Sequence, residues 1–197
     1  WSEIFSNPSS KSNLAGINAS AILEASREKI EQNLFLKNKK VVFTSGATES
    51  NNLALLGFAR NYHKKTGNYG HIITLKTEHK AVLEPLHQLK KEGFMVTEIT
   101  PERDGIISEE QFRKNIREDT FMVSIMMANN EIGVIQPIEN ISKICKLRGI
   151  TFHSDFAQCL GYIELDNLLL DVDMITMSSH KIYGCLLYTS DAADEST

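Results

Sequence analysis

The sequence has 197 residues, of which 42% are hydrophobic and 23% charged, and its formal net charge is -4 at pH 7. This length and balance are typical of one good-sized globular domain. A negative net charge gives no electrostatic reason to expect binding to nucleic acid or to an anionic membrane. No stretch approaches the ~20 consecutive apolar residues that a membrane span needs.

Neither a leader nor a disulfide framework is expected from the residue pattern. The segment 1–8 lacks the basic and then apolar regions of a secretory signal. The cysteines Cys145, Cys159 and Cys185 are odd in number and have no CxxC spacing. This pattern disfavours a zinc site or disulfides and predicts a reducing compartment, which we take to be the cytoplasm.

Two hydrophobic periodicities alternate along the chain. Helical spacing predicts helices over 18–36, 48–65, 79–92, 108–117 and 137–148. Short apolar or alternating runs predict strands over 40–44, 71–75, 94–99, 121–127, 150–153 and 172–177. Strands that alternate with helices of this length predict an α/β fold, with a mainly parallel sheet and helices on both faces.

Polar and reactive residues gather where the predicted strands end. In open α/β sheets, ligands bind beyond the carboxyl ends of the strands. The clusters at these ends are 45–50, 77–80, 129–131, 155–158 and 178–181. The sequence therefore predicts one site along this edge.

The first cluster, "SGATES", can be understood in two ways. A small, hydroxyl-rich turn before a helix offers free N–H groups and the positive end of the helix dipole to a phosphate. Alternatively, Ser45 or Thr48 simply caps the helix. The Gly-Lys-Ser/Thr pattern of nucleoside triphosphate sites is absent.

Three further residues also have two interpretations each. Lys181, beyond an apolar strand, is a candidate amine nucleophile for a carbonyl group, or a surface lysine. Asp155 is a candidate partner for a protonated ring nitrogen, or a helix cap. His79 is a candidate for stacking on a flat ring, or another cap. Together with a phosphate-binding turn, they are the parts of a pyridoxal phosphate (PLP) site.

Five motifs, in order, resemble a known family. "FTSGATESNNLA", "IITLKTEHKAVL", "VSIMMANNEIGVIQP", "FHSDFAQ" and "SSHKIYG" are similar to the cysteine desulfurases of the NifS/IscS type. These belong to the class V aminotransferase-like PLP enzymes. The resemblance extends from about residue 7 to residue 184. It implies the large domain of a type I PLP-dependent transferase.

The resemblance also implies roles for individual residues. Lys181 would hold PLP covalently, and His79 would stack on the ring and assist proton transfers. Asp155 would pair with the pyridinium nitrogen. The remaining cofactor-binding residues would be Ala47 and Thr48 at the phosphate, Ser178 and His180 beside them, Gln158 at the ring oxygen and Asn130 near the substrate carboxylate. No metal is implied.

The implied reaction converts L-cysteine to L-alanine and leaves a persulfide on an enzyme cysteine. The sulfur would pass to an iron–sulfur scaffold or to another acceptor in a tRNA-thiolation pathway, and the full-length enzyme would be a homodimer. Two alternatives stay open. One is a selenocysteine lyase, or another class V PLP lyase or aminotransferase; the other is a catalytically dead binding domain.

The resemblance ends after Gly184. We interpret 1–184 as a partial PLP-binding domain with an incomplete N-terminal segment, and 185–197 as a non-native tail from sequencing-adapter read-through. The small C-terminal domain, the persulfide cysteine and the substrate-binding arginine would then be missing, so we expect little turnover. Cys145 and Cys159 are interpreted as structural. Phe156, where a small residue is usual, would crowd the ring or pack beneath it.

Overall fold

The computed structural model describes residues 6–34, 40–163 and 171–182. These residues divide into two units, 6–34 with 40–43, and 44–163 with 171–182. The predicted tail, 185–197, and the proposed boundary at Gly184 lie outside the described residues.

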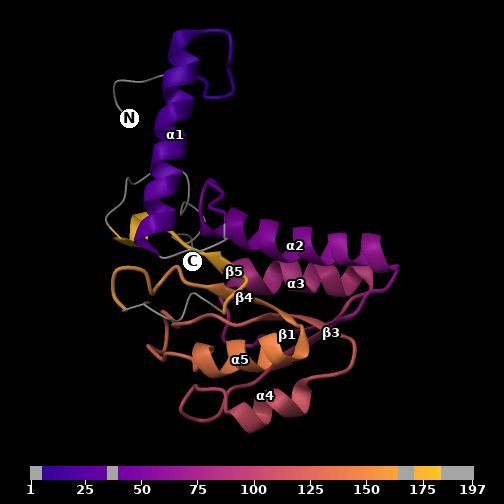
Figure 1. The fold of residues 1–197 in the computed structure, drawn as a ribbon. Coiled ribbons are helices and arrows are strands. Elements are labelled where there is room, and N and C mark those ends of the chain that lie inside the picture. Colours follow the sequence, from indigo (N-terminus) through magenta and orange to yellow (C-terminus); the bar gives the residue numbers. More distant parts are fainter. Residues whose placement is uncertain (1–5, 35–39, 164–170, 183–197) are drawn as a thin grey trace, which may run out of the picture. The chain divides into compact units, whose positions relative to one another are not determined.

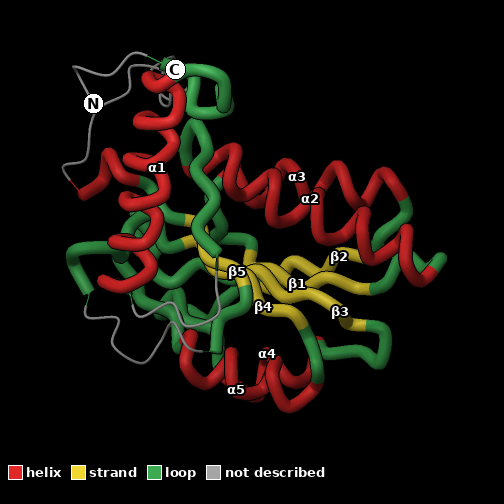
Figure 2. The backbone as a smooth tube through the Cα atoms, turned by 45° about the horizontal axis from the view of Figure 1, so that its top comes forward, coloured by secondary structure: helices red, strands yellow, loops and turns green. Residues whose placement is uncertain are grey.

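The larger unit is built on a parallel sheet with helices on both faces (Figure 1). The strands, in the spatial order β2-β1-β3-β4-β5, are β2 (Met95–Ile99), β1 (His71–Leu75), β3 (Thr120–Ser124), β4 (Thr151–Asp155) and β5 (Met174–Thr176). One face is covered by α2 (Ala47–Thr66) and α3 (Lys80–Glu92), the other by α4 (Glu109–Asn115) and α5 (Ile138–Arg148), as Figure 2 also shows. The predicted α/β class is confirmed.

The strand order places a change of direction between β1 and β3. The chain first moves outward from β1 to the edge strand β2, and then returns past β1 to β3 and onward to β5. Because parallel crossovers are right-handed, this reversal sends α3 to one face and α4 and α5 to the other. Such a switch point is where open α/β sheets bind ligands.

Apolar side chains of α2 and α3 anchor one face of the sheet. Leu55 and Ala59 of α2 and Val82, Leu86 and Leu89 of α3 are all fully buried. They form one cluster with residues of β1 and β3, namely Ile72, Phe121 and Met122. This packing fixes the start of α2 relative to the strand ends, which matters for the site below.

Most predicted elements are confirmed within two residues, because their apolar periodicity reflects burial against this sheet. The predicted cap of the helix at 108–117 is also confirmed, since Ser108 Oγ accepts from the N–H of Gln111 at 3.3 Å. The strand predicted over 121–127 is shorter, ending at Ser124. Even so, Met127 N–H still donates to the carbonyl of Asp155 at 3.1 Å, so the pairing continues irregularly.

The predicted strand over 40–44 is wrong: these residues are irregular. A strand needs a neighbour that takes up its backbone hydrogen bonds. Here side chains take that place, because Glu31 Oε1 accepts from Val41 N–H at 3.3 Å and Arg27 donates to the carbonyl of Val41. Val42 and Phe43 are exposed, so their apolar character does not report core burial.

The smaller unit contains α1 (Leu14–Asn33), which begins four residues before the helix predicted from residue 18. Its start is fixed by Asn13, whose Oδ1 accepts from Gly16 N–H at 2.6 Å. No helix within the described ranges is long and apolar enough to cross a bilayer.

Two buried histidines link the five strands of the sheet through their side chains. On β1, His71 bonds Thr120 Oγ1 of β3 at 2.7 Å and Thr97 Oγ1 of β2 at 2.8 Å. On β4, His153 bonds Ser124 Oγ of β3 at 2.9 Å and Thr176 Oγ1 of β5 at 3.1 Å. A neutral imidazole has one donor and one acceptor, and hydroxyl groups can serve either.

Burial lowers the pKa of His153 from 6.5 to about 4. The unfolded chain therefore binds more protons than the folded chain between these values, so stability is complete above about pH 6.5 and falls as pH drops toward 4. The loss should approach about 3 kcal/mol, at 1.36 kcal/mol per pKa unit. The free energy of unfolding, measured with urea across this pH range, should depend less steeply on pH in His153→Gln than in the unmodified protein.

If the free energy of unfolding depends on pH equally in His153→Gln and in the unmodified protein, the assignment is contradicted.

Candidate active site

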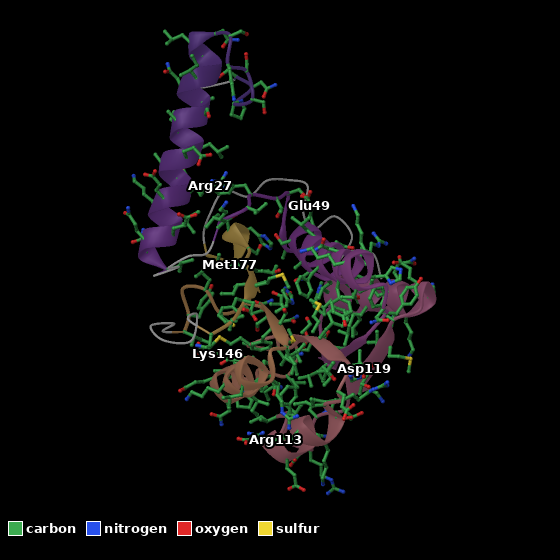
Figure 3. All side chains as sticks on the ribbon, turned by 45° about the vertical axis from the view of Figure 1, so that its right-hand side comes forward. Arg27, Glu49, Arg113, Asp119, Lys146 and Met177 are labelled. Carbon is green, nitrogen blue, oxygen red and sulfur yellow. The ribbon has the colours of Figure 1, made fainter. Side chains whose placement is uncertain are left out.

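The carboxyl ends of β1, β3, β4 and β5 meet at one edge of the sheet, because all neighbouring strands are parallel. In Figure 3, Met177, which follows β5, lies at the opposite end of the sheet from Asp119, which precedes β3. The helix α2 packs against β5. Predicted site residues from four clusters therefore belong to this edge.

Asp155, the last residue of β4, has a buried carboxylate with two hydrogen bonds. Only 5% of the residue is exposed. Its Oδ1 accepts from the N–H of Ala157 at 2.9 Å, and its Oδ2 accepts from Asn51 Nδ2 at 2.7 Å. Burial raises its pKa, while these two donors and nearby His79 oppose the rise. The helix-cap interpretation of Asp155 fails, because no helix follows it directly; the residues after it form a turn.

A second buried carboxyl group, Glu78, lies close enough to interact with Asp155. Its Oε1 accepts from Met126 N–H at 2.7 Å, and its Oε2 has no hydrogen-bond partner among the described residues. Burial is the main cause that raises the pKa of Glu78 well above 4.5, and the charge of Asp155 adds to it. The sequence analysis placed Glu78 in the cluster 77–80 but gave it no role, since a glutamate in a loop normally faces water.

His79 caps α3 with its ring, which confirms the capping interpretation. Its Nδ1 accepts from Ala81 N–H at 3.1 Å. An accepting Nδ1 carries no proton, so the proton of the neutral ring is on Nε2. His79 is an exposed residue, and it interacts electrostatically with the carboxylate of Asp155.

The N-terminus of α2 has no side-chain cap. The capping position is Gly46, so the predicted caps by Ser45 or Thr48 are wrong. Ser45 instead donates its N–H to Glu49 Oε2 at 2.5 Å. Ala47 is half-buried and Thr48 is exposed at the first turn. The uncapped N–H groups and the helix dipole favour an anion here, as the phosphate-binding interpretation requires.

The loop after β5 carries the candidate lysine. Ser178 is buried, and its Oγ bonds His180 Nδ1 at 2.6 Å. Lys181 lies in a short 3-10 helix, Ser179–Ile182, where its side chain is exposed and its carbonyl accepts from Tyr162 Oη at 3.2 Å. An exposed amine fits both the surface and the nucleophile interpretations, so the role of Lys181 stays a prediction.

Two other predicted residues occupy loops at this edge. Asn130 is exposed, whereas its neighbour Asn129 is buried and donates to the carbonyl of Thr77 at 2.6 Å. This bond ties the loop after β3 to the loop after β1. Gln158 is half-buried in the turn after β4. The roles expected of Asn130 and Gln158 stay predictions.

Cys145 and Cys159 are free and buried, and desolvation is the main cause that raises the pKa of each thiol to about 12. Such thiols are poor nucleophiles, which agrees with their interpretation as structural. Phe156 is fully buried. Whether it would crowd the ring or pack beneath it stays a prediction. Among the described residues, no group of three or more His, Cys, Asp or Glu could hold a metal ion.

The fold defines an α/β protein with a parallel sheet and a topological switch point, and a buried acid, a histidine and a helix N-terminus lie at the carboxyl ends of its strands. The family model for "Aminotransferase class-V" matches residues 1–195. The chain therefore belongs to the class-V aminotransferase family.

Its curated relatives include proteins named cysteine desulfurase IscS. The one from Ehrlichia chaffeensis is 49% identical over 180 residues, which is 91% of this chain and 43% of the relative. The one from Vibrio atlanticus is 51% identical over 180 residues, which is 91% of this chain and 44% of the relative. The chain thus spans less than half the length of these relatives.

Solved structures agree with this assignment. A NifS-like protein superposes with a TM-score of 0.84 at 38% identity, covering 93% of this chain and 50% of the other. The structure described as SspA in complex with cysteine gives 0.82 at 38% identity, covering 93% and 52%. The chain is therefore a homologue of cysteine desulfurases, and it covers about half the length of each of these two structures.

Glu78 provides a test of the buried carboxyl pair. Since its pKa is raised in the folded state, folding binds a proton above pH 4.5, and stability falls as pH rises from there. Glu78→Gln should therefore gain stability relative to the unmodified protein between about pH 5 and pH 8. Chemical unfolding at both pH values measures this difference.

Exposed Glu84 of α3 is the matched control, and Glu84→Gln should show no such gain. A Glu78→Gln variant with equal effects at both pH values would show that Glu78 is ionised in the folded protein, contrary to this account.

Proposed function

We propose that this chain is the cofactor-binding part of a PLP-dependent cysteine desulfurase, an enzyme that converts L-cysteine to L-alanine and transfers the sulfur as a persulfide. The observation that carries the proposal is the buried Asp155 carboxylate, held at the carboxyl edge of a parallel sheet by a side chain of α2. Homology to cysteine desulfurases supports the reaction class.

The residues at this edge fit PLP at both ends of the cofactor. The uncapped start of α2, at Ala47 and Thr48, suits a phosphate, because its N–H groups are available as donors. Ser178 and His180 are joined by a hydrogen bond and would support the phosphate from the opposite loop. Asp155 suits the ring nitrogen, since a buried carboxylate holds a proton firmly on a neighbouring base.

When bound, PLP supplies an electron sink that stabilises negative charge on the carbon next to the substrate amino group. Asp155 serves this chemistry by holding a proton at the ring nitrogen. Its low-dielectric surroundings strengthen that interaction. The hydrogen bonds from Ala157 and Asn51 keep the carboxylate in one orientation.

His79 would lie against the ring and move protons there. Its capping bond to Ala81 fixes the imidazole orientation and leaves Nε2 as the proton-bearing atom. In this tautomer His79 is a hydrogen-bond donor at Nε2; to accept a proton there, the ring would have to carry its own proton on Nδ1 and give up the capping bond from Ala81. Asn130 and Gln158 would bind polar groups of the substrate and the ring from the loops after β3 and β4.

Lys181 would hold PLP through its amine, from the loop after β5. The persulfide would form on a cysteine other than Cys145 or Cys159, because burial keeps both thiols protonated. The whole protein would work as a homodimer in the cytoplasm and pass sulfur to an iron–sulfur scaffold or another acceptor protein.

Covalent trapping tests the proposal. Borohydride reduction after addition of PLP should fix the label on Lys181, as read by peptide mass spectrometry, because only an amine bonded to the PLP aldehyde is reduced in place. Lys181→Ala should lose the label, whereas Lys80→Ala, an exposed lysine beside His79, should keep it. Label spread evenly over surface lysines would refute a specific site.

The same trap tests the substrate class. L-Cysteine added before borohydride should decrease the amount of label trapped on Lys181 more than D-cysteine does. Both enantiomers capture free PLP equally, and only one fits a chiral site. Equal loss with both enantiomers would contradict L-cysteine as substrate.

A further inference from the structure

Asn51 is a fully buried polar residue of α2 that the sequence motifs did not single out. Its Nδ2 donates to Asp155 Oδ2 at 2.7 Å, while its Oδ1 has no hydrogen-bond partner among the described residues. A carboxylate only accepts, so the amide must turn its NH₂ group toward Asp155. A buried carbonyl oxygen without a hydrogen-bond partner destabilises the fold. An apolar residue would therefore be more stable at this position, unless the hydrogen bond made by the NH₂ group is needed.

Resting on the proposed function, we propose that Asn51 is a positioning residue that fixes the Asp155 carboxylate and keeps it ionised for the ring nitrogen of PLP. It acts through Asp155 and not on the cofactor. Its bond spans 104 residues of sequence and joins the first turns of α2 to the end of β4.

The place of Asn51 on α2 links the two ends of the cofactor site. It lies one turn beyond Ala47 and Thr48, on the face that continues through Leu55 and Ala59 at four-residue spacing. Both of these are fully buried against the sheet. A single rigid helix start therefore sets the phosphate-binding turn and the donor to Asp155 at a fixed separation of about 5 Å along the axis.

Several groups around Asp155 influence its ionisation, and they act in opposite directions. The Glu78 carboxyl group, before α3, and the Cys159 thiol, in the turn after β4, both interact electrostatically with it. His79 at the start of α3 favours its ionised form. Among the described residues, the backbone N–H of Ala157 and the side chain of Asn51 donate hydrogen bonds to this carboxylate. Burial and the neighbouring Glu78 carboxyl group both disfavour the ionised form of Asp155. Without the Asn51 side chain, fewer donors would stabilise that form.

The first test needs no cofactor. In Asn51→Ala the folded-state pKa of Asp155 should rise further, so stability should fall as pH rises from about 5 to 8. The increase in the unfolding constant caused by Asn51→Ala should be tenfold to a hundredfold larger at about pH 8 than at about pH 5. This is the size expected for loss of a hydrogen bond to a charged group. Introducing Asp155→Asn as well should abolish this pH-dependent part.

The matched control is Asn52→Ala, the adjacent asparagine, whose Nδ2 donates to the Thr48 carbonyl of its own helix. It should show no pH-dependent loss. Asn51→Asp keeps the side-chain volume but replaces the donor with a second acid; it should be less stable than Asn51→Ala at about pH 8 and recover at about pH 5. Equal losses at both pH values in Asn51→Ala, or a pH dependence that survives Asp155→Asn, would overturn the proposal.

The second test uses PLP itself. Titration followed by absorbance should show binding weakened about tenfold or more in Asn51→Ala at about pH 8, and unchanged in Asn52→Ala. Equal affinity in Asn51→Ala and the unmodified protein would overturn the positioning role. If the unmodified protein fails to bind PLP while the cofactor-free test succeeds, the proposed function fails and the Asn51–Asp155 interaction stands.

Discussion

A carboxylate buried at the end of β4 is the constraint on which the site depends. Asp155 is held there by strand pairing on both sides and by Asn51 from α2. A buried charge is costly unless donors surround it, so the elements that supply those donors cannot move independently. The start of α2 and the turn after β4 are therefore positioned by one group.

The strands that carry this carboxylate are aligned by side chains as well as by backbone. His153, two residues before Asp155, bonds hydroxyl groups on both neighbouring strands. A one-residue slip would move these side chains to the opposite face of the sheet. The two buried imidazoles thus help to set the register that brings Asp155 and Ser178 to the same edge, and burial lowers the pKa of both rings.

Apolar periodicity in the sequence was sufficient to predict the α/β class and most elements, since the helices pack one face each on the sheet. The strand-end rule located Asp155 and His79. Asn51 was missed because Asn51 and Asn52 are identical in type, although the four-residue spacing to Leu55 marks the buried one. The strand at 40–44 was predicted wrongly, because an apolar run does not reveal whether a neighbouring strand exists; side chains of α1 bond Val41 instead.

The most direct test of this account is the protonation state of the cofactor nitrogen. PLP labelled with ¹⁵N in the ring should be bound to the protein and its chemical shift followed by NMR from about pH 6 to pH 9. If Asp155 is the ionised partner that we propose for this nitrogen, the shift stays at the protonated value across the range. A bound cofactor with the shift of an unprotonated nitrogen at about pH 8 would contradict the central claim.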